Sequence, residues 1–231
     1  MKQILKSTIV VNLLFVLTSN IYAEWDIGGS VGATYWLPKW EHEIVNFDSD
    51  TSGIYGPVAF LHYGPVGLGI QYYTGEYDVS FHDTTDEINA DRTDLDIIIS
   101  YRIAKIFQVA VLYKQIDLEW IDVLTIKTDI NGFGLGGGFS KIYQANGFML
   151  YGFGFYLPDL DNERTTSGID ESIQFDSDGY WLEAGIGYLI PTSHLLLKAG
   201  YRYQKIDATS NGKDNWGEEN KGLRAEISYY F

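Results

Sequence analysis

The chain of 231 residues carries 31 acidic and 16 basic residues, which gives a formal net charge of −15. This balance argues against nucleic acid as a partner, because an acidic surface is repelled by a phosphate backbone. The sequence contains no cysteine, so disulfides and a lipid-modified N-terminal cysteine are excluded.

The first 23 residues, MKQILKSTIVVNLLFVLTSNIYA, are typical of a secretory signal peptide. Lys2 and Lys6 precede a short apolar core, and Ala23 is a small residue suited to cleavage. The core is too short to span a bilayer, and no apolar run of about 18 residues follows it. We therefore expect residues 1–23 to be removed and residues 24–231 to form one domain.

Ten segments beyond the leader alternate apolar residues with small or polar ones. Near residue 184, for example, Leu182, Ala184 and Ile186 alternate with Glu183 and Gly185. Most segments have about the 9–11 residues that a tilted strand needs to cross a bilayer. The segments are 25–36, 54–63, 66–77, 93–103, 107–115, 130–139, 147–157, 179–190, 194–204 and 222–231.

The connections between these segments alternate between long and short. The long ones are 37–53, 78–92, 116–129, 158–178 and 205–221. Outer-membrane barrels combine long external loops with short periplasmic turns, and an even strand number returns both chain ends to one side. Aromatic residues near the predicted strand ends suit a girdle at the membrane interfaces. They are Tyr35, Trp36, Tyr63, Tyr101, Tyr113, Tyr188, Tyr203 and Tyr229.

These features predict an all-β fold, a closed antiparallel transmembrane β-barrel of ten strands, with eight strands as the alternative. Its apolar faces would point to lipid and its polar faces to the lumen. A soluble sandwich, with the apolar faces turned inward, is the other interpretation of the same alternation.

The last strand, GLRAEISYYF, alternates apolar and polar residues and ends on Phe231. With WDIGGSVGATYW, WLEAGIGYLI and LLLKAGYRYQKID, it resembles the small bacterial outer-membrane β-barrel proteins of 8–10 strands. The resemblance implies integral localisation in the bacterial outer membrane, and Phe231 as part of an assembly signal. It also implies outer-membrane lipid, lipopolysaccharide and the barrel-assembly machinery as partners of a monomer.

Charged residues occur on the faces predicted to point into the lumen. Register places Asp96 opposite Lys114 and predicts that Glu183 lies opposite Gly200, within reach of an ion pair with Lys198 or Arg202. We expect such pairs to fill the lumen, because isolated charges there are costly; a narrow selective pore is the alternative. The predicted luminal network is Asp96, Arg102, Lys114, Glu183, Lys198, Arg202, Arg224 and Glu226.

Most of the acids fall in the long connections. Asp159, Asp161 and Glu163 space carboxylates as a calcium-binding loop could, although solvated charge is the plainer interpretation. No other cofactor is expected. Apolar residues of these connections could instead form a protein-binding tip. They are Trp40, Ile44, Phe47, Trp120 and Trp216.

Motifs for catalysis are weak. Ser193-His194 resembles the pair of outer-membrane lipid A deacylases, but it lies in a predicted periplasmic turn, and neighbouring strand residues point to opposite faces. Omptin proteases also have ten strands, and His42 and His82 lie beside acids, but barrels of that family are longer than the segments predicted here. We therefore expect a non-enzymatic outer-membrane protein with a structural or surface-interaction role. The alternatives are a narrow porin-like channel and, third, an outer-membrane hydrolase of the deacylase or omptin type.

Overall fold

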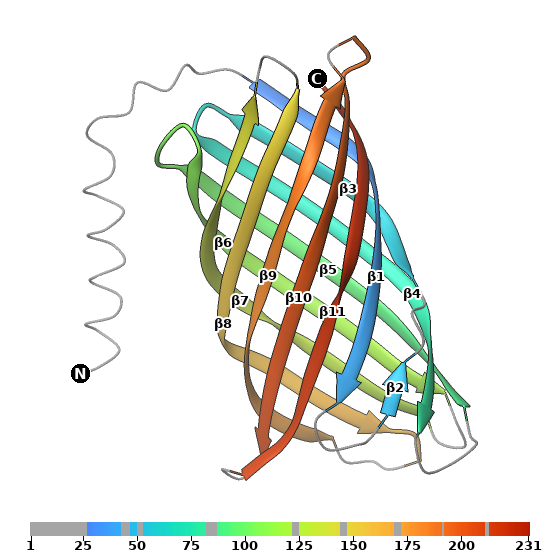
Figure 1. Cartoon of the computed structure of the whole chain (residues 1–231). Helices are drawn as coiled ribbons and strands as arrows, with labels where there is room; N and C mark the ends of the chain where they lie inside the picture. The colour runs from blue at the N-terminus through green and yellow to red at the C-terminus, as the bar shows by residue number, and fades with distance from the viewer. Residues whose placement is uncertain are drawn as a thin grey trace, which may run out of the picture.

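Ten long antiparallel strands close into a barrel in the computed structural model (Figure 1). The structure describes residues 27–42, 47–49, 53–81, 87–121, 125–143, 147–168, 172–190, 192–210 and 213–231. The barrel strands are β1 (Ile27–His42), β3 (Ile54–Tyr63), β4 (Val66–Phe81), β5 (Glu87–Arg102), β6 (Phe107–Ile121), β7 (Thr125–Tyr143), β8 (Phe148–Thr166), β9 (Ile173–Ile190), β10 (Leu195–Ser210) and β11 (Lys213–Tyr230). A short strand, β2 (Phe47–Ser49), pairs with β1 and β4. The described residues contain no helix long and apolar enough to cross a membrane.

Closure of the barrel depends on the first and last strands. β1 pairs with β3 on one side and with β11 on the other, so neither edge is left open. The last residue belongs to this closure, because the Phe231 and Gly29 backbones exchange two N–H···O bonds of 2.9 Å. A closed ladder satisfies every strand's backbone groups, which is what a hydrocarbon environment demands. The predicted fold class and the strand number of ten are confirmed, and the eight-stranded alternative is wrong.

The strands run further than the sequence indicates. β7 and β8 each have 19 residues, and most of the predicted long connections are strand rather than loop. In the range 116–129, Ile116 and Leu118 are buried in the lumen while Asp117 and Glu119 are on the outer face. The outer face becomes charged here because the strands have passed beyond the bilayer into water. The barrel therefore protrudes from the membrane at the end with the long connections.

An apolar belt surrounds the part of the barrel nearer the short turns. Its exposed side chains include Val31, Leu61, Leu68, Ile99, Val111, Leu135, Leu182, Ile186, Leu197, Leu223 and Ile227. So much exposed apolar surface is stable only against lipid. Tyr35, Tyr63, Tyr188 and Tyr229 are exposed on this face, as a girdle requires. The prediction that Trp36 belongs to the girdle is wrong. Its side chain is fully buried inside the barrel, because alternation along β1 turns it inward.

Apolar side chains also fill the lumen toward the end with the long connections. This core includes Trp36, Trp40, Ile54, Tyr77, Leu112, Ile116, Ile130, Leu157 and Ile206. Trp40 is 1% exposed and its ring lies 4.7 Å from that of Trp120. These two residues therefore do not form the predicted exposed tip. Ile44 lies outside the described residues, as do the side chains of Phe47 and Trp216.

The glycine-rich run from Gly132 to Gly138 lies within β7, and strand β8 follows it rather than a helix. A dinucleotide-binding loop needs a helix at that point. Other glycines make room inside the barrel: a Cβ on Gly185 or Gly200 would lie 2.7 or 2.5 Å from the Tyr151 hydroxyl. The absence of a side chain at these positions lets one large aromatic residue occupy the lumen.

Replacing Phe231 with aspartate should lower the amount of folded, heat-modifiable barrel recovered from outer membranes. The Phe231 side chain is 53% exposed at the belt's edge, so the change places a charge at the lipid interface on the closing strand. Ser193→Asp is the matched control, because it adds the same charge in an exposed turn at the same end. Equal recovery of the two variants would contradict a special role for Phe231.

Candidate functional site: a chain of ion pairs across the lumen

Ten charged side chains meet inside the barrel. Strands β5, β6, β9, β10 and β11 each turn alternate residues inward, and on these strands several of those residues are charged. The five carboxylates are Asp94, Asp96, Glu183, Glu218 and Glu226, and the five cations are Arg92, Lys114, Lys198, Arg202 and Arg224. The set is therefore electrically neutral.

The ten residues form one continuous chain in which acids and bases alternate. The first part of the chain has the nitrogen–oxygen distances Glu218–Arg92 (2.8 Å), Arg92–Asp94 (2.7 Å), Asp94–Lys114 (3.3 Å) and Lys114–Asp96 (2.7 Å). Asp96 continues it to Arg202 (3.5 Å), and Arg202 to Glu183 (2.9 Å). The last part is Glu183–Arg224 (2.7 Å), Arg224–Glu226 (2.7 Å) and Glu226–Lys198 (2.7 Å). We call this set the luminal ion chain. All members except Lys198 have side chains that are almost fully buried.

Two of these contacts cross the lumen. Asp96 on β5 reaches Arg202 on β10, and Arg92 on β5 reaches Glu218 on β11. β5 is a neighbour of neither β10 nor β11 in the sheet, so these contacts join opposite walls. Gln71 on β4 adds a third wall, because its side-chain oxygen accepts a 2.8 Å hydrogen bond from Arg202.

Arg202 is enclosed by aromatic rings as well as by acids. Its guanidinium carbon lies 5.2, 4.9 and 4.7 Å from the ring centroids of Trp36, Tyr73 and Trp181. Cation–π contacts of this kind gain strength when water is excluded. Arg202 thus connects the ion chain to aromatic residues that fill the lumen beside it.

The structure places most of the predicted luminal residues in this chain. Asp96 lies opposite Lys114, as predicted. Arg102, which is in the predicted network, lies opposite Gln108, is exposed at the barrel mouth and is not part of the chain. The predicted register of Glu183 is wrong, since it faces Arg202 and not Gly200. The register differs because Ile190 pairs with Leu195, so four residues separate the paired positions of β9 and β10.

Arg92, Asp94 and Glu218 are absent from the predicted network. Arg92 and Glu218 lie in ranges predicted to be loops, where alternation carries no meaning. Asp94 shares the inward face of β5 with Asp96, so alternation alone was sufficient to find it.

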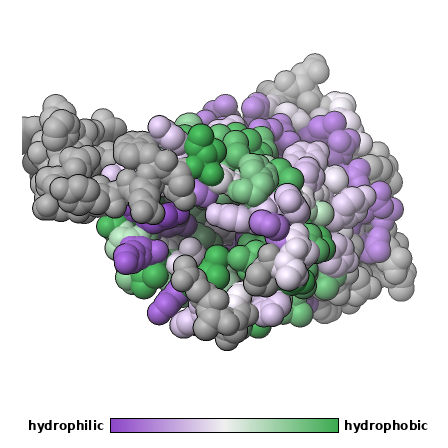
Figure 2. All heavy atoms as spheres, turned by 90° about the horizontal axis from the view of Figure 1, so that it is seen from above, coloured by the Kyte–Doolittle hydropathy of each residue, from purple (hydrophilic) through white to green (hydrophobic). Residues whose placement is uncertain are grey.

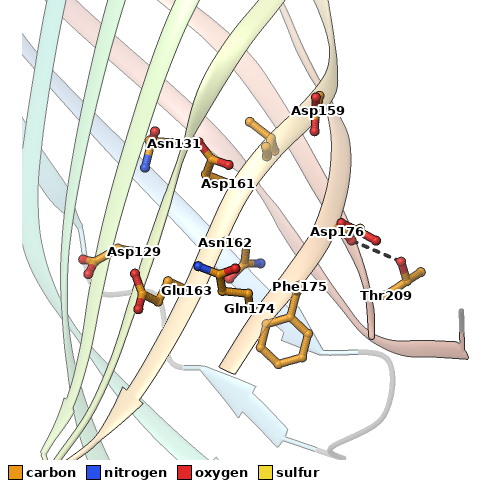
Figure 3. A pocket seen from close by; sticks show the side chains of 11 residues that line it. Asp129, Asn131, Asp159, Asp161, Asn162, Glu163, Gln174, Phe175, Asp176 and Thr209 are labelled. Atoms are coloured by element: carbon orange, nitrogen blue, oxygen red, sulfur yellow. Dashed lines mark hydrogen bonds between the residues drawn. The ribbon is translucent and has the colours of Figure 1, made fainter. Parts of the chain in front are cut away.

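A second group of charged residues lies outside the barrel, beyond the belt. Asp161 and Glu163 lie on the outer face of β8, where Asp161 faces Asn131 and Asp176, and Glu163 faces Asp129. Together with Asp159 they line an open cavity of about 690 Å³ (Figure 3). Figure 3 shows Asp129 beside Glu163 and Asn131 beside Asp161, with Asp159 further along the strand.

This acidic cavity is not a ready-made calcium site. Among the described residues, no group of three acidic or histidine side chains is arranged to hold a metal ion. The predicted triad depended on a loop, whereas a strand spaces same-face residues about 6.5 Å apart. An irregularity between Leu157 and Leu160 further displaces Asp159. Asp83 and Asp86, in another acidic connection, lie outside the described residues.

Crowding of acids on this outer face affects Asp129. Partial burial and the neighbouring charges of Asp117 and Glu163 raise the pKa of Asp129 above its ordinary value. Glu41, elsewhere on the outer face, shows the opposite effect. A hydrogen bond from Lys221, at 2.8 Å, lowers the pKa of Glu41.

The motifs considered for hydrolysis are not brought together in the described residues. Ser193 and His194 lie in the turn before β10, where the His194 ring centroid lies 6.0 Å from that of Tyr229. His82 and the side chain of His42 lie outside the described residues. The length of the strands removes one objection to an omptin-like protease, because this barrel is longer than the sequence predicts.

No protein-family model matches the chain, and no curated protein matches it. Among solved structures it is similar to the outer-membrane protease OmpT from Escherichia coli, with a TM-score of 0.53 and 11% identity over 93% of this chain and 100% of that one. It is also similar to the translocator domain of the autotransporter NalP from Neisseria meningitidis, with a TM-score of 0.45 and 12% identity over 100% and 96% of the two chains. It is likewise similar to Neisserial surface protein A, with a TM-score of 0.44 and 15% identity over 89% of this chain and 97% of that one.

At these identities the likeness concerns the fold alone. The closed barrel and its apolar belt are those of a bacterial outer-membrane β-barrel protein, in agreement with the predicted integral localisation in that membrane. In such a barrel the end with the short turns faces the periplasm and the end with the long connections faces outward.

Arg202→Met should destabilise the barrel by about 3–5 kcal/mol, because it leaves Asp96 and Glu183 buried with a missing partner. Adding Glu183→Gln should recover part of this loss. Urea unfolding in detergent, followed by tryptophan fluorescence, measures both effects. Arg102→Met is the control, and its cost should stay within about 0.5 kcal/mol since the residue is exposed. An equally small cost for Arg202→Met would contradict the ion chain.

Asp129→Asn should stabilise the fold at neutral pH by less than about 1 kcal/mol, given solvent screening. A carboxyl whose pKa is raised by folding favours the fold only below its unfolded pKa, and that contribution is lost as the pH rises through the folded pKa. The gain from asparagine should therefore vanish in acid. Asp207→Asn is the control, because Asp207 is paired with Lys205 at 3.0 Å and should show no gain. A pH-independent effect of Asp129→Asn would contradict the assignment.

Proposed function

We propose that the protein is a non-enzymatic outer-membrane barrel whose lumen is filled, and that it serves a structural or surface-interaction role. The observation that carries this proposal is the luminal ion chain, which joins opposite walls through Asp96–Arg202 and Arg92–Glu218. In a porin lumen, charged side chains are hydrated and contact the permeating ions. Here the charges neutralise one another, so a permeating ion would have to break a buried pair to gain a ligand.

The apolar core supports the same proposal. Leu112, Ile116, Ile130 and Ile206 are at most 1% exposed and fill the lumen beside the ion chain, with Ile116 opposite Asp94 and Ile206 opposite Glu218. Hydrated ions do not enter a packed apolar layer, because they would lose their water without compensation. Charge neutralisation and apolar packing therefore both oppose conduction.

The surface role rests on the part of the barrel beyond the membrane. There the outer face carries acids in adjacent rows, including Asp117, Asp129, Asp161, Glu163 and Asp176. Because these residues lie on paired strands rather than on free loops, they present a fixed acidic surface. Such a surface suits a cationic partner, or lipopolysaccharide phosphates bridged by divalent ions.

The purified protein in planar bilayers should show no discrete single-channel steps. The matched variant Arg202→Ser with Arg224→Ser, once shown to be folded by heat modifiability, should raise the conductance because it removes the two guanidiniums that bridge the acids. Uniform steps from the unmodified barrel would overturn the proposal in favour of the narrow channel. Turnover of peptide or lipid A substrates by the same preparation would favour the hydrolase.

A further inference from the structure

Several stretches of this acidic chain contain no acid, among them residues 51–75 and 184–206. Residues 97–116 and 130–158 also have neither aspartate nor glutamate, although the chain has 31 such residues. The last two stretches cover the periplasmic half of strands β5 to β8 and the turns between β5 and β6 and between β7 and β8. Three exposed cations lie at that end: Arg102, Lys105 and Lys141. Figure 2 looks onto this end and shows hydrophilic residues standing among hydrophobic ones.

Lys105 and Lys141 are neighbours. Phe107 on β6 pairs with Phe139 on β7, and the Ser140 N–H donates a 2.9 Å hydrogen bond to the Ile106 carbonyl oxygen. Lys105 is the residue before Ile106 and Lys141 is the residue after Ser140, so the two lysines flank this contact. Both therefore lie on the same part of the periplasmic rim.

The position of Lys141 along β7 corresponds to the level of the lipid headgroups. Its face of the strand continues through Phe139 and Leu135 to Phe133, all exposed, and then reaches Asn131. The ten residue-to-residue steps from Asn131 to Lys141, at about 3.3 Å each and tilted by about 40°, span roughly 25 Å. That is the height of the apolar band of such barrels, so Lys141 marks its periplasmic boundary. Its Nζ lies 4.8 Å from the Tyr143 ring centroid.

The lysines on the outer face at the other end of the barrel each have a carboxylate partner. Lys39, Lys127 and Lys221 lie 3.1, 3.0 and 2.8 Å from a carboxylate. Within the part of the chain that the structure describes, Lys105 and Lys141 make no ion pair. Two adjacent unpaired cations repel each other, and an anion between them would remove that cost.

We propose that Lys105 and Lys141, with the Tyr143 ring beneath Lys141, bind the phosphate of a glycerophospholipid headgroup in the periplasmic leaflet. The exposed apolar residues Phe139 and Leu150 lie beside the pair, where the acyl chains of the same lipid would pass. Lysine at the apolar boundary extends its ammonium to the headgroups while its stem stays in contact with apolar surface. The site would hold one lipid against the β6–β8 wall.

Native mass spectrometry of the folded protein in a non-ionic detergent tests this site. Phosphatidylglycerol is titrated beside diacylglycerol with the same acyl chains, which lacks the phosphate. We expect phosphatidylglycerol to bind more tightly, and Lys105→Gln with Lys141→Gln to raise its Kd about tenfold. The matched control, Lys39→Gln with Lys127→Gln, removes two exposed lysines at the other end and should leave the Kd within about twofold.

Two results would overturn the proposal. Equal binding of diacylglycerol and phosphatidylglycerol would mean that the phosphate is not recognised. An unchanged Kd in the Lys105 and Lys141 variant would mean that these lysines do not recognise it. Both variants change only exposed side chains outside the luminal ion chain, so we expect both to remain heat-modifiable. Heat modifiability is measured first, so that only folded barrels are compared.

Discussion

The guanidinium of Arg202 is buried in the lumen and is neutralised by carboxylates from two walls of the barrel. Asp96 comes from β5 and Glu183 from β9, and each of these acids contacts a further cation, Lys114 or Arg224. A charge buried without a partner costs several kcal/mol. The alternation of sign along the whole chain follows from that cost, because each added charge requires the next. The closed lumen is a consequence of satisfying these groups.

The bilayer imposes the complementary constraint on the outer face. Where lipid surrounds the strands, the outward positions are apolar and the inward ones are small or polar. Beyond the bilayer the outward face inverts from apolar to acidic, while the inward face mixes apolar side chains with the buried charges of Arg92 and Glu218. Along β6, outward Val111 gives way to Asp117, while inward Lys114 gives way to Ile116 and Leu118. The lumen is thus filled by the ion chain together with an apolar core.

This inversion explains how much could be predicted. Alternation within the bilayer is simple, and it sufficed for the ten strands, their direction and the Asp96–Lys114 pair. Above the bilayer, charged outward residues give the appearance of loops, so alternation does not identify Arg92 and Glu218 as luminal or Trp40 as buried. Trp36 is a different case: it lies in a predicted strand, but on the inward face rather than in the girdle. The Glu183 register failed for a local reason, since the number of residues in a turn cannot be read from alternation. The calcium triad is predicted for a loop, whereas its three acids lie along β8, and calcium binding there stays a prediction. The signal peptide and the assembly role of Phe231 remain predictions.

A double-mutant cycle between Lys114 and Glu183 tests most directly whether the luminal charges act as one chain. The two residues have no contact with each other, and they are linked only through Asp96 and Arg202. If the chain is continuous, Lys114→Met and Glu183→Gln should show a coupling free energy above about 0.5 kcal/mol in urea unfolding. Additive effects, within about 0.3 kcal/mol, would mean that the pairs are independent. That result would contradict a single network holding the lumen closed.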